Sequence, residues 1–171
     1  MRSSCPGGGL FLALATVAVV SAKGMTTRIV ITGAQLGAPI ELRDRGVVAA
    51  FNVWSGPGTR MNGVEAIDGF IVDWRSGAVE PTVSNLWQFE ISFYADENSF
   101  GSSRPVYVVS YGLNPLSGDG YVYIPGRGDP RWGANVRSIF RGSKYEGHWF
   151  RATAGWQNVM RTHVIGNRPA A

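Results

Sequence analysis

LWQFEISFYA (residues 86–95), PVYVVSYG (105–112) and GYVYIP (120–125) are the segments that decide the fold. Apolar side chains occupy positions 87, 89, 91 and 93 of the first segment, and polar side chains stand between them. This alternation is typical of a strand that packs one face on a core and exposes the other. The connection at residues 113–120 contains Asn-Pro and Asp-Gly turn signals. Residues 86–125 are therefore predicted to form an antiparallel meander of three strands.

Shorter segments with strand patterns flank the meander, and one helix follows it. The further strands are predicted at Thr26–Thr32, 40–42, 69–74 and 147–152. Thr153–Val164 places Trp156, Val159 and Met160 on one side at helical spacing, with Thr153 as its N-cap. The predicted fold is α+β, an antiparallel sheet of five to seven strands with the C-terminal helix packed on it. A small β-barrel with one helix is the alternative.

Three segments between these elements carry less decisive patterns. Asp44 is placed to cap a short helix over residues 45–51. Residues 135–141 (NVRSIFR) fit either helical turns with Arg137 and Arg141 on one side or an edge strand. Residues 54–63 (WSGPGTRMNG) read as a turn, because they lack the Lys-Ser/Thr of a phosphate-binding loop.

The composition is that of one folded domain. The chain has 171 residues, of which 44% are hydrophobic and 16% charged, so disorder is excluded. Its 23 glycines and 9 prolines follow no repeating period, which indicates many turns between short strands.

The first 22 residues have the pattern of a secretory signal peptide. Arg2 precedes an apolar run of eleven residues, Leu10 to Val20, and small residues lead to Ala22. The run is shorter than the roughly 18 to 20 residues that span a bilayer, so no transmembrane segment is expected after cleavage. The predicted division is a signal peptide at 1–22 and a single globular domain at 23–171, secreted or periplasmic. Translation from Met25 would instead make the protein cytoplasmic.

Cleavage after Ala22 would remove Cys5, the only cysteine, and with it any disulfide or thiolate chemistry. No cofactor and no metal site are predicted.

Several motifs along the chain carry a resemblance. They are RIVITGAQLGAPIEL (28–42), VWSGPG (53–58), GDGYVYIPGRGDPRW (118–132), NVRSIFRG (135–142) and GHWFRATAGW (147–156). The pattern resembles an uncharacterised group of exported bacterial proteins. The resemblance implies export from a bacterial cell and transfers no activity or site residue.

Charge is distributed unevenly along the chain. Residues 23–100 carry six basic and nine acidic side chains, whereas residues 101–171 carry nine basic and three acidic ones. Arginine dominates the basic half, and its planar guanidinium suits phosphate and carboxylate groups. The predicted ligand-binding residues, in which aromatic rings stand among arginines, are Arg127, Arg131, Trp132, Arg137, Arg141, Trp149 and Arg151. The partners expected for them are an anionic polymer, a lipid headgroup or a glycan, and not nucleic acid, because the protein is predicted to be exported.

The preferred functional hypothesis is therefore a non-enzymatic binding domain of the cell envelope. The alternative is an envelope polysaccharide hydrolase that uses Asp73 and Glu90, since both carboxylates lie beside aromatic residues. The two histidines, His148 and His163, lie in no motif of a nucleophilic or zinc enzyme.

Overall fold

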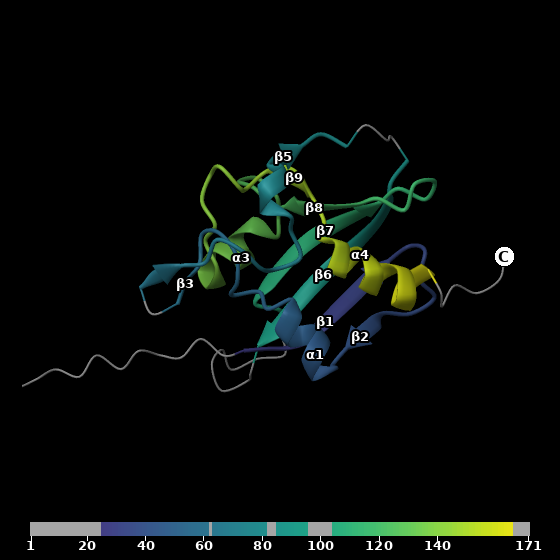
Figure 1. Ribbon diagram of the computed structural model, residues 1–171, viewed down its shortest axis with the longest axis horizontal. Helices are drawn as coiled ribbons and strands as arrows, with labels where there is room; N and C mark the ends of the chain where they lie inside the picture. The colour runs from purple at the N-terminus through teal and green to yellow at the C-terminus, as the bar shows by residue number, and fades with distance from the viewer. Residues whose placement is uncertain (1–24, 62, 82–84, 96–103, 166–171) are drawn as a thin grey trace, which may run out of the picture.

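The computed structural model describes residues 25–61, 63–81, 85–95 and 104–165. Within them, seven antiparallel strands form one sheet in the order β2-β1-β6-β7-β8-β9-β5 (Figure 1). These strands are β1 (Thr26–Gly33), β2 (Ile40–Leu42), β5 (Ala78–Val79), β6 (Trp87–Ala95), β7 (Tyr107–Leu113), β8 (Gly120–Ile124) and β9 (His148–Arg151). The sheet is open at both edges. The α+β prediction is thus confirmed, and the β-barrel alternative is wrong.

The meander predicted from residues 86–125 is β6, β7 and β8. Its register pairs Phe89 with Tyr111 and Ile91 with Val109, and all four side chains are buried. The apolar positions of β1 join the same layer, because Ile31 pairs with Ile91. Alternation in the sequence therefore specifies which face of the sheet packs on the core.

Helices cover that face. Figure 1 shows α1 (Arg45–Ala50) and α4 (Ala154–Met160) lying across β1 and β6. The caps are those predicted, since Asp44 accepts a hydrogen bond from Val47 N and Thr153 accepts one from Trp156 N. A π-helical turn, Arg161–Ile165, continues α4, and Trp156 is completely buried. The predicted end of this helix at Gly166 lies outside the described residues.

The ambiguous segment at residues 135–141 is partly helical. Helix α3 spans Trp132–Ser138, and Ile139 is already extended, with φ −138° and ψ 112°. Asn135, on this helix, forms the two hydrogen bonds that a neighbouring strand would otherwise form with Val108 of β7. Its side-chain amide accepts a hydrogen bond from Val108 N (2.8 Å) and donates one to Val108 O (2.7 Å), where β8 no longer pairs with β7.

The strand predicted at residues 69–74 is not formed. Gly69 and Phe70 have positive φ angles of 106° and 68°, which break an extended backbone. Only a single bridge, from Val72 to Ala152, remains, and the short 3₁₀ helix η1 (Trp74–Ser76) follows. The segment at 54–63, predicted as a turn, contains the strand β3 (Arg60–Met61), which pairs with β4 (Val64–Glu65) in a small hairpin that the sequence did not predict.

The second face of the sheet carries polar and partly exposed side chains. The register aligns Glu90, Ser110, Tyr123 and Trp149 in one row across β6 to β9. None of these four residues is fully buried. Among the described helices, none has the length and apolar character that crossing a bilayer requires.

Candidate ligand-binding groove beside a buried arginine

The side chain of Arg141 lies in the core, with an exposed fraction of 1%. Its guanidinium donates hydrogen bonds to three backbone carbonyls of one loop: Val53 O at 2.8 Å, Pro57 O at 2.9 Å and Ser55 O at 3.3 Å. Within the described residues it forms no ion pair with a carboxylate. A buried cation therefore holds residues 53–57 through carbonyl dipoles alone.

Three aromatic rings surround the same guanidinium. Its carbon lies 4.5 Å from the ring centre of Phe70, 5.2 Å from that of Tyr107 and 5.5 Å from that of Trp74. Cation–π contacts of this kind are strongest when water is excluded. Burial lowers the pKa of Arg141 and the Tyr107 side chain opposes this shift, but an arginine remains protonated at neutral pH.

Glycines allow the loop at residues 53–58 to approach its neighbours closely. A Cβ on Gly58 would lie 2.4 Å from Arg141 Cα, and one on Gly56 would lie 2.8 Å from Trp74 Nε1. Phe70 completes the arrangement with a positive φ that costs a bulky residue on the order of 1–3 kcal/mol. Such strain persists only where the surrounding contacts define the conformation, and it is concentrated at functional sites.

We call Arg141, with the three carbonyls and three rings that contact its guanidinium, the clamp. Beside the clamp, Trp74 and Tyr145 line a groove. Their ring centres are 5.4 Å apart at an interplanar angle of 75°, and the Trp74 indole donates to Gly69 O at 3.0 Å. The groove has a volume of about 340 Å³ and is lined by Pro57, Ile67, Asp68, Trp74, Arg75 and Tyr145. We call it the Trp74 groove. An adjoining cavity of about 210 Å³ shares Asp68, Trp74 and Arg75 and adds Asp73 and Thr153.

The charged groups of the Trp74 groove and of the adjoining cavity are held by contacts with neighbouring residues. Asp68 and Arg75 form an exposed ion pair of 3.4 Å. The hydroxyl of Ser76 donates to Asp73 at 2.5 Å and Arg75 N donates at 3.1 Å. The Ser76 hydrogen bond is the main cause that lowers the pKa of Asp73. Asp73 is thus a carboxylate at neutral pH, which accepts hydrogen bonds and has no proton to give.

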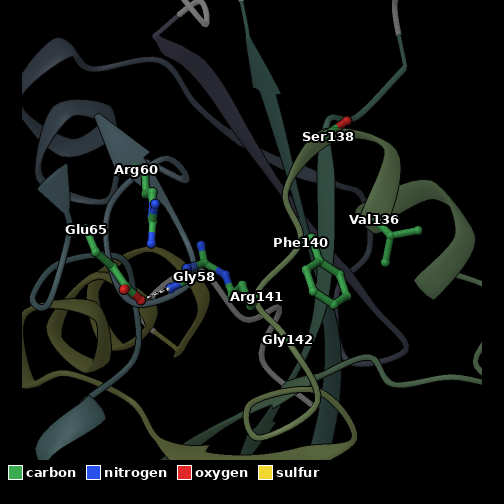
Figure 2. A pocket seen from close by; sticks show the side chains of 8 residues that line it. All are labelled: Gly58, Arg60, Glu65, Val136, Ser138, Phe140, Arg141 and Gly142. Atoms are coloured by element: carbon green, nitrogen blue, oxygen red, sulfur yellow. Dashed lines mark hydrogen bonds between the residues drawn. The ribbon is translucent and has the colours of Figure 1, made fainter. Parts of the chain in front are cut away.

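A second pocket lies on the other side of Gly58. It has a volume of about 540 Å³ and lies between the β3–β4 hairpin and the segment that follows α3 (Figure 2). Arg60 and Glu65 come from the hairpin, Ser138 is the last residue of α3, and Phe140 comes from the segment after it. We call it the Arg60 pocket.

Arg141 was predicted as part of an exposed basic surface, and this expectation is corrected by its burial. Helix α3 ends at Ser138, so Arg141 does not continue the helical side that carries Arg137. The extended backbone at Ile139 places the next residues differently, with Phe140 exposed and Arg141 inside.

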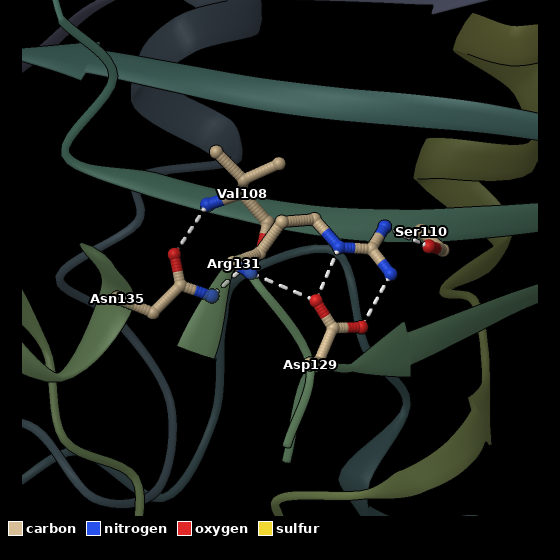
Figure 3. Close-up of polar contacts among 5 residues, drawn as sticks. All are labelled: Val108, Ser110, Asp129, Arg131 and Asn135. Atoms are coloured by element: carbon tan, nitrogen blue, oxygen red, sulfur yellow. Dashed lines mark hydrogen bonds and ion pairs between the residues drawn. The ribbon is translucent and has the colours of Figure 1, made fainter. Parts of the chain in front are cut away.

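Arg131 is engaged within the protein. Figure 3 shows its guanidinium against both carboxylate oxygens of Asp129, at 2.8 and 2.5 Å, while Nη1 donates to the hydroxyl of Ser110. This pairing lowers the pKa of Asp129 and raises that of Arg131. The charge of Arg131 is therefore already compensated.

The other predicted ligand-binding residues are distributed over different contacts. Arg127 lies 5.6 Å from the ring centre of Trp132, whose indole donates to Glu146 at 2.9 Å. On the open face of the sheet, the rings of Trp149 and Tyr123 are 5.2 Å apart. On the same face, Arg151 lies 5.9 Å from the ring centre of Tyr121. The exposed arginines of the predicted set are Arg127, Arg137 and Arg151.

Asp73 and Glu90 do not meet in one cleft. Asp73 N donates to Arg151 O, which places Asp73 next to β9 on the side away from β8. Glu90 lies on β6, so β7, β8 and β9 stand between the two residues. Four interstrand spacings of about 4.8 Å separate them by roughly 19 Å of sheet. Paired glycosidase carboxyl groups need about 5 to 9.5 Å. In the part of the chain that is described, no cluster of three or more His, Cys, Asp or Glu side chains is suited to a metal ion.

The sequence pattern did not predict the residues that build the Trp74 groove, although Asp73 was placed beside an aromatic residue. The available signal was the glycines in two segments, WSGPG at 54–58 and DGF at 68–70. These segments lie so close together that a Cβ on Gly56 or Gly69 would crowd the other segment. Comparisons with protein-family models, with curated proteins and with solved structures find no match for this chain.

Proposed function

We propose that this protein is an exported, non-enzymatic binding domain that holds a neutral glycan in the Trp74 groove. The observation that carries the proposal is the perpendicular pair of Trp74 and Tyr145 at the wall of a groove with charged hydrogen-bonding groups. The signal-peptide pattern of residues 1–22 supports export.

The chemistry of the groove matches a sugar on two sides. Aromatic rings offer flat apolar surface to the C–H groups of a pyranose. The Asp68 carboxylate and the Arg75 guanidinium, both exposed, offer acceptors and donors to hydroxyl groups. Ligand sites commonly combine an apolar wall with a few fixed polar groups in this way.

The charges around the groove nearly balance. Asp68 and Asp73 are negative, in and beside the groove. Two positive charges oppose them, because Arg75 lines the groove and Lys144 Nζ lies 4.9 Å from the ring centre of Tyr145. An anionic sugar would therefore gain no net attraction there, and a neutral glycan is the ligand that the groove suits. Binding without turnover is supported by the lowered pKa of Asp73, because a general acid needs a raised pKa.

The test is a titration of the purified chain with malto-, cello- and chito-oligosaccharides, followed by tryptophan fluorescence and calorimetry. We expect binding to one series in the micromolar to millimolar range, with little dependence on salt because no charge is neutralised. Tyr145→Ser should weaken that binding at least about tenfold, since one wall of the groove is lost. Asp68→Asn should weaken it less.

Tyr123→Ser is the matched control, because Tyr123 is a half-buried tyrosine beside a tryptophan on the open face of the sheet. It should leave the affinity unchanged. Loss of binding in Tyr123→Ser with retention in Tyr145→Ser would overturn the assignment of the groove. Hydrolysis of any of these sugars would overturn the non-enzymatic role.

A further inference from the structure

The Arg60 pocket presents two opposite charges that form no ion pair with each other. Arg60 and Glu65 are directly paired across β3 and β4, yet no ion pair joins them. Glu65 Oε1 instead accepts a hydrogen bond of 3.1 Å from Gly58 N. Within the described residues, Arg60 has no carboxylate partner. The Gly58 amide therefore holds the carboxylate in place and leaves the guanidinium available.

The two charged groups lie within reach of one small ligand. Directly opposed residues of antiparallel strands have Cβ atoms about 5 Å apart and project from the same face, and both side chains line the pocket. The carboxylate and ammonium of an α-amino acid share a single carbon, so one ligand carries a partner for each side chain. A simple anion would be attracted by Arg60 and repelled by Glu65, and a simple cation would meet the reverse.

An apolar surface completes the pocket. Phe140 is 58% exposed, which is unusual for a phenylalanine with no covering element. Figure 2 shows it on the side opposite Arg60 and Glu65, with Arg141 between them. The volume of about 540 Å³ lies in the range of small-molecule sites.

The walls of this pocket are fixed relative to one another. Gly58 lies against the backbone of Arg141, so close that a Cβ there would meet Arg141 Cα at 2.4 Å. Arg141 in turn binds the carbonyls of residues 53, 55 and 57. The loop at residues 53–58, to which Glu65 is hydrogen-bonded, is therefore held against the segment after α3, and a ligand would not need to bring the two together.

We propose that the Arg60 pocket binds a free α-amino acid with an apolar side chain. Arg60 pairs with its carboxylate, Glu65 pairs with its ammonium group, and Phe140 packs on its side chain. The site is independent of the proposed glycan groove, with which it shares no lining residue.

The experiment uses three probes with the full chain: L-phenylalanine, N-acetyl-L-phenylalanine and L-phenylalanine amide. Calorimetry or NMR titration should show that L-phenylalanine binds at least about tenfold more tightly than either blocked form, since each lacks one charge. Arg60→Gln should weaken binding of the free and acetylated forms and leave the amide unchanged. Glu65→Gln should weaken binding of the free and amide forms and leave the acetylated form unchanged.

Arg43→Gln is the matched control, an exposed arginine that follows β2 and pairs with Glu41 at 2.7 Å. It should bind all three probes as the wild type does. The folded state of each variant is checked by thermal denaturation, and exposed positions such as 60 and 65 should leave it intact. Equal affinity for the three probes, or no binding of L-phenylalanine at millimolar concentration, would overturn the proposal.

Discussion

The guanidinium of Arg141 contacts backbone carbonyls and aromatic rings. Moving a cation from water to the core is costly, and a single unsatisfied donor, its Nε, remains. The hydrogen bonds to Val53, Ser55 and Pro57 and the contacts with three rings offset this cost only in one geometry. A planar, multiply donating group is required there.

Replacing Arg141 by Met should therefore lower the free energy of unfolding by about 3 kcal/mol or more, because three buried carbonyls lose their donor. Arg141→Lys should be only partly tolerated, since an ammonium group lacks the planar fork. Urea denaturation measures both. Arg137→Gln, at an exposed position of α3, should change stability by less than about 0.5 kcal/mol. A cost below about 1 kcal/mol for Arg141→Met would contradict the clamp.

Tyr111 and Gly120 allow a test by a double-mutant cycle. The buried hydroxyl of Tyr111 has no hydrogen-bond partner within the described residues, and a Cβ on Gly120 would lie 1.9 Å from it. Tyr111→Phe should be neutral or slightly stabilising, because an unsatisfied polar group is removed. Gly120→Ala should cost about 2 kcal/mol or more through overpacking, and less in the Tyr111→Phe background. Strict additivity of the two changes in thermal or urea unfolding would contradict the contact.

The sequence does not distinguish Arg141 from the arginines that stay on the surface. The pattern NVRSIFR placed Arg137 and Arg141 four residues apart, which on a continuous helix is one side. Whether the helix continues past Ser138 depends on tertiary contacts of Asn135 and Ile139, and these are invisible in the pattern. Charge is readable from a sequence, whereas the depth of a charge is not.

At the scale of elements, segments with clear alternation were predicted correctly and segments with unusual backbone angles were not. Strands β1, β6, β7, β8 and β9 follow from apolar periodicity, as does helix α4 with its Thr153 cap. The Trp74 groove and the Arg60 pocket lie instead beside Gly56, Gly58, Gly69 and Phe70, all at positive φ. A left-handed phenylalanine has no local signature, because its conformation is imposed by the residues packed around it.

The turn before α3 makes a pH-dependent contribution to stability. The Arg131 side chain holds the pKa of Asp129 below the ordinary value for an aspartate. The unfolded chain therefore binds a proton before the native chain does as the pH falls. The contribution is complete above the ordinary pKa of about 3.9 and is lost as the pH falls through the lowered native value.

Asp129→Asn should accordingly reduce the loss of stability between about pH 6 and about pH 3. The measurement is the urea midpoint of wild type and variant across that range. Asp73, whose pKa is lowered by Ser76, should leave a residual dependence of the same sign. An Asp129→Asn curve parallel to that of the wild type would show that the ion pair does not contribute.

For the whole molecule, one face of the sheet carries the core and helices, and the irregular segments at 53–76 and 138–147 carry both cavities. The fold class followed from alternation because burial of a sheet face is a property of the entire chain. The cavities could not be predicted in this way, because they are built from loops that are distant in the sequence. The contacts of Arg141 with residues 53, 55 and 57, for example, join segments more than 80 residues apart.

Asn135 has a consequence for the molecule as a solute. The pairing of β7 with β8 does not extend to Val108. Without Asn135, the N–H and C=O of Val108 would therefore have no hydrogen-bond partner on that side of β7. Asn135→Ala should lower the free energy of unfolding by about 2 kcal/mol and raise light scattering on mild heating. Asn158→Ala, at an exposed position of α4, should do neither.

An unfilled strand position is a template on which a second chain can add, and repeated addition produces fibrils. In this protein one carboxamide, only two hydrogen bonds wide, occupies that template before another chain arrives. Asn135 thus blocks the addition of a second chain at that stretch of β7, and its loss in Asn135→Ala should make the chain more prone to aggregate.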